Sequence, residues 1–403
     1  MSTREIHVVV VGISTAGIGV AKKVAALATN GFPNLRVTII DKNEYTYHSI
    51  GAPRGIVDKE FGRSLFFRLD TLLTTFETDS AKPKHRFIQA LLKTVNKETI
   101  ELSTGETLEF DYLVLATGAA NTFPGNVNAP TLEDGRSRLA QLHDNVEAAS
   151  NVLVIGGGAV GVEIAGEIAD QYPSKQVTLV HSASRLLPLN FKEGISNGAV
   201  YKLRRLGVEV VLNERINIPA DTQFDGAVRP MTLVGRSGRE YTSDVQFLAT
   251  GTKVHSEYMA TLEQHLGTSL REKNGTIKVK PTLQLATNAL SNIFAVGDVN
   301  SLPAGAKYAV KAGEQAQLAA ANLIAIISSG CDSAKAAKPV LQNWNGSVMN
   351  MIAVPIGKSL GVLQASGIAF GKSCVGDIVV SRVKAKDYFV SKTAKEFPPN
   401  ANA

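Results

Sequence analysis

Hydrophobic residues gather in short runs along this chain, and each run is followed by small and polar residues. His7–Val11 is such a run; a glycine-rich turn ends it, and an Ala- and Val-rich stretch with helical spacing, Ile18–Ala28, follows. The next apolar run, Val37–Ile40, ends at Asp41. Runs that are apolar throughout are typical of strands in a parallel sheet, because helices cover both faces of such a sheet. The pattern predicts a strand–turn–helix–strand unit over residues 7–41.

A second unit of the same kind begins about 144 residues after the first. It consists of Val152–Ile155, Gly156–Gly158, Val160–Ala169 and Val177–Val180. Two more apolar runs end alike: residues 112–118 and 245–251 both finish in Ala-Thr-Gly. A duplication on this scale predicts two nucleotide-binding domains of similar topology.

The rest of the chain suggests a linker and a small third domain. Ala129–Ser137 is polar, contains Pro and Gly, and is expected to be a linker, whereas Ser328–Ser333 is a turn-rich break. Residues 334–403 begin with two apolar runs and end in a stretch with helical spacing. The runs are Val348–Pro355 and Leu360–Gln364, and the apolar positions of the helical stretch are Val379, Val383, Val390, Ala394 and Phe397.

The first glycine-rich turn departs from the GxGxxG pattern of dinucleotide-binding folds. Gly12 and Gly17 are in place, but Ser14 stands where the pattern has its second glycine. Serine is small, and its hydroxyl can bond a phosphate at a helix N-terminus. Asp41, 24 residues after Gly17, is placed to accept hydrogen bonds from ribose hydroxyls. The alternative is an ordinary turn between a strand and a helix.

The second turn satisfies the pattern fully, with Gly156, Gly158 and Gly161. Its second strand ends at His181 instead of an acid. A carboxylate there would repel a 2′-phosphate, so its absence tolerates NADPH, and Arg185 is a candidate phosphate partner or simply a solvated surface residue. The choice between NADH and NADPH stays open.

A third element, Asn292–Asp298, is an apolar strand that ends in Gly297-Asp298. Such a strand can aim a carboxylate at a ligand, although a lone Gly-Asp pair is usually only a turn. Each of these motifs is a weak signal by itself. Their order along the chain is the stronger signal: two glycine-rich turns, two Ala-Thr-Gly strands and a late Gly-Asp.

In that order, the motifs resemble the flavoprotein family with two dinucleotide domains (the pyridine-nucleotide disulfide oxidoreductase fold). The similarity is to its branch of apoptosis-inducing-factor-like proteins, which includes the ferroptosis suppressor proteins. It covers nearly the whole chain and includes Gly156–Glu167, Val177–Ser182, Asn292–Asp298 and Lys384–Ser391. The resemblance implies an α/β fold: two Rossmann-like dinucleotide-binding domains, as in glutathione-reductase-like flavoproteins, plus a small α+β C-terminal domain. The expected domains are 1–125 with 288–327 for FAD, 126–287 for NAD(P)H, and 328–403 at the C-terminus.

The resemblance also implies which residues contact the cofactors FAD and NAD(P)H. The first turn is expected on the FAD pyrophosphate, Arg54 on the flavin, Ile88 at the adenine and Asp298 at the ribityl and phosphate region. The expected cofactor contacts are Gly12, Ile13, Ser14, Thr15, Ala16, Gly17, Asp41, Arg54, Ile88, Thr117, Gly118, Gly156, Gly158, Gly161, His181, Gly251, Gly297 and Asp298.

Two residues are candidates for catalysis by the same resemblance. Glu163 matches a glutamate near the contact of nicotinamide and flavin, and Lys307 matches a lysine whose charge would stabilise the anionic reduced flavin. Their alternatives are an exposed helical glutamate and a solvated loop lysine. His48 also matches, but a lone histidine is more often structural. Gln315 and Gln317 lie where related type II NADH dehydrogenases carry quinone-site glutamines.

The chain contains only two cysteines, Cys331 and Cys374, 43 residues apart. No redox dithiol can be built from that spacing, which excludes glutathione- or thioredoxin-reductase chemistry. Reduced flavin must then pass electrons directly to its acceptor. The expected activity is an FAD-dependent NAD(P)H:quinone oxidoreductase. The alternatives are a redox-gated binding protein like apoptosis-inducing factor, or a reductase of ferredoxin or monodehydroascorbate.

Composition adds a local detail. Of the 403 residues 44% are hydrophobic, and the formal net charge is +6. Residues 326–403 hold nine Lys and Arg against four Asp and Glu, so they carry five of these six charges. A basic helix there could lie on an anionic membrane, or pack on the flavin domain or on a second subunit.

The remaining expectations concern location and partners. No signal peptide, membrane-spanning run or N-myristoylation pattern is found, because Ser2 stands where that pattern needs glycine. A cytoplasmic protein is expected, peripheral at membranes or lipid droplets, with a homodimer as one arrangement. Nucleic acid is not expected as a partner, and the seven histidines lack the spacing of metal ligands.

Overall fold

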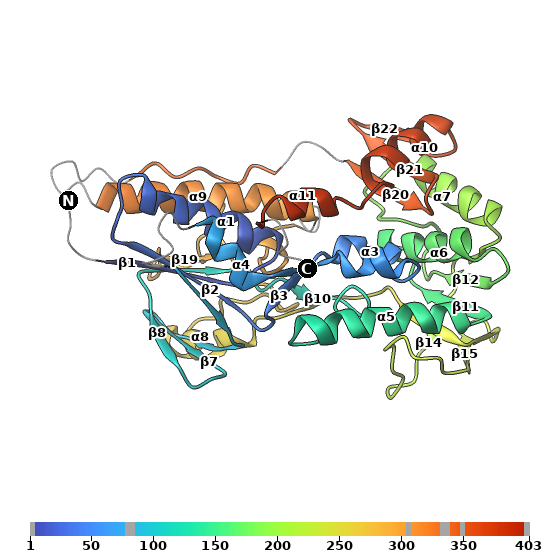
Figure 1. Cartoon of the computed structure of the whole chain (residues 1–403), viewed down its shortest axis with the longest axis horizontal. Helices are drawn as coiled ribbons and strands as arrows, with labels where there is room; N and C mark the ends of the chain where they lie inside the picture. Colours follow the sequence, from blue (N-terminus) through green and yellow to red (C-terminus); the bar gives the residue numbers. More distant parts are fainter. Residues whose placement is uncertain (1–4, 77–84, 304–307, 331–338, 347–350, 399–403) are drawn as a thin grey trace.

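The computed structural model describes residues 5–76, 85–303, 308–330, 339–346 and 351–398. A five-stranded parallel sheet, in the order β19-β9-β1-β2-β5, forms its first unit (Figure 1). β19, the strand of this sheet that comes last in the sequence, pairs with β9. A segment near residue 294 therefore completes a sheet whose other strands lie within the first 115 residues. The strands are β1 (Ile6–Val11), β2 (Leu35–Asp41), β5 (Arg86–Gln89), β9 (Tyr112–Leu115) and β19 (Ile293–Ala295).

Successive residues of the central strand β1 belong to different hydrophobic cores. Val8 and Val10 pack in the core formed with helices α1 and α9, whereas Val9 and Val11 pack in the core formed with strands β6–β8 and helix α8. Side chains alternate across a strand, so an entirely apolar strand fills both cores. The covering elements are α1 (Thr15–Thr29), α9 (Ala309–Gly330), β6 (Leu92–Val95), β7 (Thr99–Leu102), β8 (Thr107–Glu109) and α8 (Ala260–Leu266).

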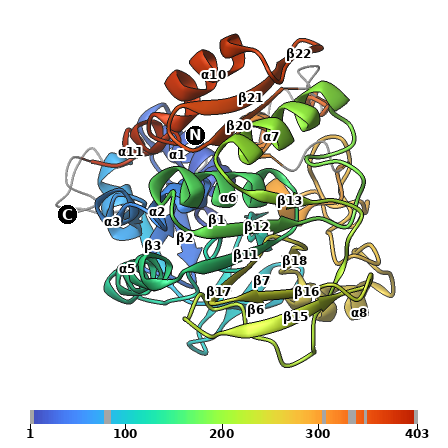
Figure 2. The same ribbon diagram turned by 90° about the vertical axis from the view of Figure 1, so that its right-hand side faces the viewer.

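The second sheet is also parallel, in the order β13-β12-β11-β17 (Figure 2). Its central strand β11 (Asn151–Ile155) leads through the second glycine-rich turn into α6 (Ala159–Gln171). Both repeated units that the hydrophobic pattern predicts are therefore present, and the expected α/β fold class is confirmed. The other elements are β12 (Gln176–Val180), β13 (Glu209–Val211), β17 (Val245–Leu248), α5 (Leu132–Ala148), α7 (Glu193–Arg205), β14 (Ile216–Asn217), β15 (Met231–Gly235) and β16 (Glu240–Ser243).

The C-terminal segment forms an antiparallel sheet, β20-β21-β22, that packs on the second unit. Gly166 of α6 lies against Ile356, and Gly198 of α7 lies against Gly371, whereas Val380 of α10 packs on Gly361. The elements are β20 (Ile352–Ile356), β21 (Leu360–Ala365), β22 (Ile368–Phe370), α10 (Cys374–Val380), the π-helical turn η6 (Ser381–Ala385) and α11 (Val390–Ala394).

Short elements connect these layers. β10 and β18 pair antiparallel with each other, and so do β3 and β4. Their bounds are β3 (Tyr45–Tyr47), η1 (Ser49–Gly51), α2 (Ala52–Gly55), α3 (Lys59–Arg63), β4 (Phe66–Arg68), α4 (Leu69–Leu72), η2 (Leu73–Thr75), β10 (Ala119–Ala120), β18 (Lys253–Val254), η3 (Glu257–Met259) and η4 (Gly297–Val299).

The linker expected at Ala129–Ser137 is wrong over most of its length, because helix α5 begins at Leu132. Thr131 is its N-cap, and the Thr131 hydroxyl accepts a hydrogen bond from the backbone N–H of Asp134 at 3.2 Å. The polar residues that suggested a linker are thus the cap and first turn of a helix. The break expected over Ser328–Ser333 does not begin at Ser328, because α9 continues to Gly330, and residues 331–333 lie outside the described residues.

The single C-terminal helix suggested by the apolar spacing of Val379 to Phe397 is wrong as well. Tyr388 and Phe389 have φ angles of 48° and 64°, which end one helical segment before α11 begins. The π-helical turn also changes which residues face inward: Val380 is buried and Val383 is 53% exposed. Local apolar spacing alone could not reveal either feature.

The domain boundaries expected at residues 125, 287 and 327 stay a prediction, since sheet membership does not by itself locate a boundary. Within the part of the chain that the structure describes, every helix is too short or too polar to cross a membrane.

Candidate functional site

The first glycine-rich turn joins β1 to α1 with very little space. Gly12 has a φ of +90°, and a Cβ on it would overlap the carbonyl oxygen of Ala116; a Cβ on Gly17 would overlap the carbonyl oxygen of Gly12. These two positions therefore require glycine. Ser14 and Thr15 are exposed at the start of α1, where backbone N–H groups favour an anion.

The side chain that ends β2 is tied to this turn. Asp41 accepts hydrogen bonds from the backbone N–H of Ile13 at 2.8 Å and of Asn43 at 3.0 Å. Burial raises the pKa of Asp41, while these two hydrogen bonds act in the opposite direction. Ile88 lies in β5 in register with Ile40, the residue before Asp41. β2, β5 and the turn thus meet where the sequence predicts the adenosine end of the first site, and that role stays a prediction.

The late Gly-Asp strand reaches the same turn. Gly297 has a φ of +77°, and a Cβ built on it would lie 3.4 Å from the Cβ of Ala16 in α1. Asp298 is half-buried directly after it. The structure therefore brings Asp298 beside the start of α1. Gln315 is fully buried, and its side-chain oxygen accepts from the N–H of Gly297 at 2.8 Å and from Asn300 at 2.7 Å, so it holds this segment in place.

The second turn repeats the geometry of the first. Gly156 has a φ of +117°, and a Cβ on Gly161 would overlap the carbonyl oxygen of Gly156. His181 Nδ1 accepts a hydrogen bond from the N–H of Gly157 at 3.1 Å, as Asp41 does from Ile13. Burial lowers the pKa of His181, which favours the neutral ring needed for this acceptor role. Gly158 has open space where a Cβ would stand.

The two Ala-Thr-Gly strands lead into a bridge between the units. Gly118 and Gly251 have φ angles of 65° and 72°, and β10 and β18, which follow them, pair with each other. The Thr117 hydroxyl donates to the backbone oxygen of His255 at 2.9 Å and lies 2.7 Å from the Tyr258 hydroxyl.

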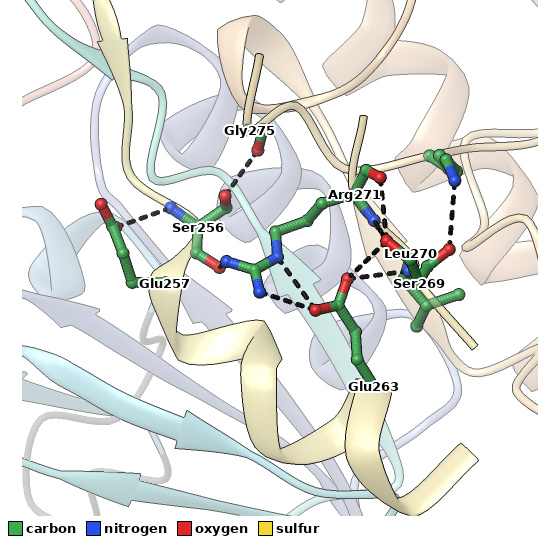
Figure 3. A network of polar contacts seen from close by, with 8 residues as sticks. Ser256, Glu257, Glu263, Ser269, Leu270, Arg271 and Gly275 are labelled. Atoms are coloured by element: carbon green, nitrogen blue, oxygen red, sulfur yellow. Dashed lines mark hydrogen bonds and ion pairs between the residues drawn. The ribbon is translucent and has the colours of Figure 1, made fainter. Parts of the chain in front are cut away.

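A polar network fixes the segment that Thr117 contacts (Figure 3). Arg271 donates to Glu263 Oε2 through Nη2 at 2.6 Å and to the backbone oxygen of Ser256 at 3.2 Å, and Ser256 Oγ donates to the oxygen of Gly275 at 2.5 Å. We assign this network a structural role, because its members bond to one another and hold the chain around η3.

Four charged side chains meet where the two units and the C-terminal segment come together, and three of them are buried while Lys384 is partly exposed. Arg54 of α2 donates to Glu167 of α6 through Nε at 2.5 Å and through Nη2 at 2.8 Å. One turn earlier on α6, Glu163 accepts from Lys384 Nζ at 2.6 Å. Arg54 is 6% exposed, Glu163 3% and Glu167 1%. The opposite charges offset each other, which makes their burial tolerable.

The environment perturbs the protonation of this cluster. Burial raises the pKa of Glu163, and the neighbouring charge of Glu167 acts in the same direction, while Lys384 opposes both. Burial alone would lower the pKa of Arg54, but its hydrogen bonds and charge interaction with Glu167 leave the pKa raised. A carboxyl group such as Glu163, whose pKa is raised by burial beside a specific charge partner, is a candidate for a functional role.

Tyr388 joins the two ion pairs. Its hydroxyl donates to Glu167 Oε1 at 2.8 Å, and its ring centroid lies 5.5 Å from the Arg54 guanidinium and 5.8 Å from Lys384 Nζ. His48, which the sequence pattern also singled out, hydrogen-bonds the backbone oxygen of Tyr388 at 2.7 Å through Nε2. His48 thus holds the C-terminal segment at the site.

Beyond Tyr388 the chain packs on the first unit. The rings of Phe397 and Phe67 stack with centroids 5.1 Å apart, and Lys22 of α1 pairs with Glu396 at 2.9 Å. In Figure 1 the red helix α11 accordingly lies beside α1. This part of the tail takes the alternative left open by the sequence, in which the apolar residues pack on the flavin unit.

Of the two expected catalytic residues, the structure places Glu163 in the buried cluster, so its alternative as an exposed helical glutamate is wrong. Lys307 lies outside the described residues. Lys384, Tyr388 and Glu167 were not expected at the site. The only sequence signals for them were the tail Lys384–Ser391, quoted for its resemblance, and the spacing of four residues between Glu163 and Glu167.

A cluster on helix α5 was tested as a metal site. His143, Asp144 and Glu147 offer ligand atoms within 4.8 Å of one another. Lys59 already pairs with Asp144, and Asp144 and Glu147 are exposed, so nothing here indicates a bound ion.

Comparisons with known proteins agree with this geometry. Residues 6–316 match the family model described as pyridine nucleotide-disulphide oxidoreductase. Human ferroptosis suppressor protein 1 is 29% identical over 401 residues, covering 98% of this chain and 97% of the relative. Apoptosis-inducing factor homolog B of Dictyostelium discoideum is 26% identical over 410 residues, covering 97% of each.

Among solved structures, the sulfide:quinone oxidoreductase of Aquifex aeolicus superposes with a TM-score of 0.69. It covers 98% of this chain and 93% of that one at 17% sequence identity. At this identity the likeness concerns the fold.

Proposed function

The chain belongs to the pyridine nucleotide-disulphide oxidoreductase family, whose cofactors are FAD and NAD(P)H, and we propose that this oxidoreductase passes its electrons to a quinone. The observation that carries the proposal is the buried cluster of Glu163, Lys384, Arg54 and Glu167 at the junction of the two nucleotide units. The sequence spacing predicts no redox dithiol beside it: the two cysteines, Cys331 and Cys374, are 43 residues apart, Cys374 is exposed on α10, and Cys331 lies outside the described residues. Electrons must therefore leave the flavin for an external acceptor.

The residues around both turns fit the two cofactors. At Gly12, Gly17, Gly156 and Gly161 the backbone packs too closely for a Cβ, which fits the tight strand-to-helix turn that presents a helix start to a pyrophosphate. We propose that FAD is held by Gly12, Ile13, Ser14, Thr15, Ala16, Gly17, Asp41, Arg54, Ile88, Thr117, Gly118, Gly297 and Asp298, and NAD(P)H by Gly156, Gly158, Gly161, His181 and Gly251.

The chemistry that bound FAD would supply is hydride acceptance from the nicotinamide and electron transfer to the acceptor. The protein supplies position and charge. Reduction of a quinone to a quinol consumes protons, and Glu163 Oε1, with a pKa raised by burial, is placed to hold one, while Lys384 steadies the ionised form. Arg54, held in a fixed direction by Glu167, presents its cation to the flavin region. Lys307 is proposed to add a cation at the pyrimidine edge.

Acceptor profiling of the holoenzyme tests this function. NADH and NADPH oxidation are measured with a ubiquinone analogue, ferredoxin and monodehydroascorbate in one steady-state assay. A quinone is expected to give the highest kcat/KM. A higher value with another acceptor would reassign the substrate, and absence of flavin absorbance would reject the proposal altogether.

Glu163→Gln tests the site itself. It keeps a hydrogen-bonding side chain beside Lys384 but cannot ionise, so kcat with a quinone should fall at least about 100-fold while flavin content is retained. Glu193→Gln, on the exposed first turn of α7, is the matched control and should retain full activity.

Similarity to apoptosis-inducing factor homologues favours one other candidate, a redox-gated binding protein with a basic tail. Salt-sensitive DNA binding with negligible turnover would support it. Peripheral contact with membranes or lipid droplets, and assembly as a homodimer, belong to the proposal as well. The first of these would suit a lipid-soluble acceptor.

A further inference from the structure

Helix α10 and the π-helical turn after it form one continuous helical segment at the outer rim of the molecule (Figures 1 and 2). Its inward positions, Gly376, Val380 and Ala385, are buried. The outward positions are also apolar: Val375 is 47% exposed, Ile378 48% and Val383 53%. A helix on the surface of a protein normally turns polar residues outward, so this face is built for contact with something apolar.

The charged residues on the same face are all basic. Arg382 and Lys386 are exposed between and beyond the apolar positions, and Lys372 is exposed just before the helix. The two acids of the segment are engaged elsewhere: Asp377 accepts from the buried Lys202 Nζ at 2.5 Å, and Asp387 accepts from the backbone N–H of Phe389 at 3.0 Å. Outward-facing apolar side chains flanked by cations match the surface of an anionic bilayer.

We propose that the outward face of residues 372–386 docks on an anionic lipid surface. A second copy of this chain is a poorer occupant. In a symmetric dimer built on this face, two surfaces that both carry Arg382 and Lys386 would meet, while the nearby carboxylates of Asp377 and Asp387 are already engaged within each subunit. Lipid headgroups supply the missing negative charge, and the acyl region accepts the valine and isoleucine side chains.

The same helical segment reaches the site from its other side. Val383 points outward, whereas the next residue, Lys384, donates to Glu163 Oε1 at 2.6 Å and to the backbone oxygen of Ala353 at 3.2 Å. Docking would thus act on a segment that also contacts the charge cluster. This inference rests on the proposed function in one respect: a quinone with a lipid tail is delivered at such a surface.

Vesicle flotation tests the docking face separately from catalysis. The holoenzyme is mixed with phosphatidylcholine vesicles, with or without phosphatidylserine, at low and high salt. We expect binding to the anionic vesicles, weakened by salt. Arg382→Gln with Lys386→Gln should bind about 25-fold more weakly, at about fivefold for each removed cation. Val375→Ser with Ile378→Ser should also weaken binding, with less effect of salt on the loss.

The control replaces two exposed lysines far from this face, Lys93→Gln with Lys97→Gln, and should bind like the unchanged protein. NADPH oxidation with a water-soluble quinone should stay unchanged in all variants. If the unchanged protein does not oxidise NADPH with the quinone, the proposed function is overturned. The vesicle measurement still decides whether the docking face binds lipid. The docking inference is overturned by three results: absent binding of the unchanged protein to anionic vesicles, equal weakening in the control, or a dimer in sedimentation velocity that the Arg382 and Lys386 changes dissociate.

Discussion

The two glycine-rich turns share one backbone design and differ in the side chain at the end of the second strand. In both, the carbonyl oxygen of a glycine with positive φ lies against the last glycine of the motif, and the N–H of the second turn residue donates to the strand-end side chain. That side chain is the carboxylate of Asp41 in the first unit and the imidazole of His181 in the second. Steric limits thus dictate the glycines that both turns share, whereas the side chain that accepts the hydrogen bond differs between them.

The difference bears on what each unit can bind. A carboxylate accepts from two ribose hydroxyls, which suits Asp41 for the adenosine half of FAD. A neutral imidazole carries no charge to repel a 2′-phosphate, so the second turn is open to NADPH as well as NADH. Ser14 and Gly158 occupy corresponding positions in the two turns. Ser14 is exposed and a Cβ on Gly158 would enter open space, so both positions can hold a small side chain.

The largest effect is expected where the two turns agree. Gly17→Ala would force a Cβ into the carbonyl oxygen of Gly12, and should lower the free energy of unfolding by at least about 3 kcal/mol. Gly158→Ala enters open space and should cost less than about 1 kcal/mol. Urea unfolding of both variants measures the contrast. Equal losses would mean that the close approach at Gly17 does not limit stability.

Exchanging the strand-end chemistry should change nucleotide selectivity. His181→Asp copies the first unit into the second, and the new carboxylate should repel a 2′-phosphate. We expect kcat/KM for NADPH to fall about 10- to 100-fold relative to NADH. Steady-state kinetics with both nucleotides tests this. His181→Asn keeps a neutral acceptor for the Gly157 N–H and is the control, in which the ratio should barely change.

The junction where the two units meet should respond less. Tyr388→Phe removes one donor from Glu167 while the ring keeps its place beside Arg54, so stability should fall by about 1.5–3 kcal/mol. Arg54 still holds Glu167, so flavin content should be unaffected. Thermal unfolding and flavin absorbance measure both. Tyr201→Phe, on an exposed face of α7, provides the comparison and should change neither.

The smallest effects concern pH, and they have opposite signs in the two turns. Burial lowers the pKa of His181 in the folded protein. Its contribution to the free energy of unfolding is therefore complete above its pKa in the unfolded chain, about 6.5, and is lost as pH falls. Burial raises the pKa of Asp41, so its share is present at low pH and is lost as pH rises through the folded pKa.

Comparing the unchanged protein with His181→Asn and Asp41→Asn isolates these shares from those of other buried groups. His181→Asn should lessen the fall in stability on acidification below pH 6.5, and Asp41→Asn the fall above pH 3.8. Urea unfolding across pH 4–8 measures both, with at most about 1.4 kcal/mol per pH unit from one group. Slopes of the same sign in both variants would contradict this assignment.

The repeated units could be predicted from sequence because their signals are local. An apolar strand, a glycine turn and a helix occupy about thirty consecutive residues, and the turn glycines are dictated by their own neighbours. The linker at Ala129–Ser137 was misjudged because a capped first turn and a polar loop have the same composition. The C-terminal helix failed for a different reason: Tyr388 and Phe389 take left-handed backbone conformations that only tertiary contacts, such as that with His48, select.

The candidate site divides in the same way. Glu163 follows its glycine motif by two residues, so its position on the buried start of α6 was within reach of sequence reasoning. Its partner Lys384 is 221 residues away, and Tyr388 stands equally far from Glu167. Sequence by itself determined the two repeated units, since they depend on residue type and short spacing, and it predicts that no redox dithiol accompanies them. Which charges neutralise one another, and which face of the C-terminal helix remains open, was decided only by the tertiary structure. Burial of a charge depends on partners that folding alone brings together.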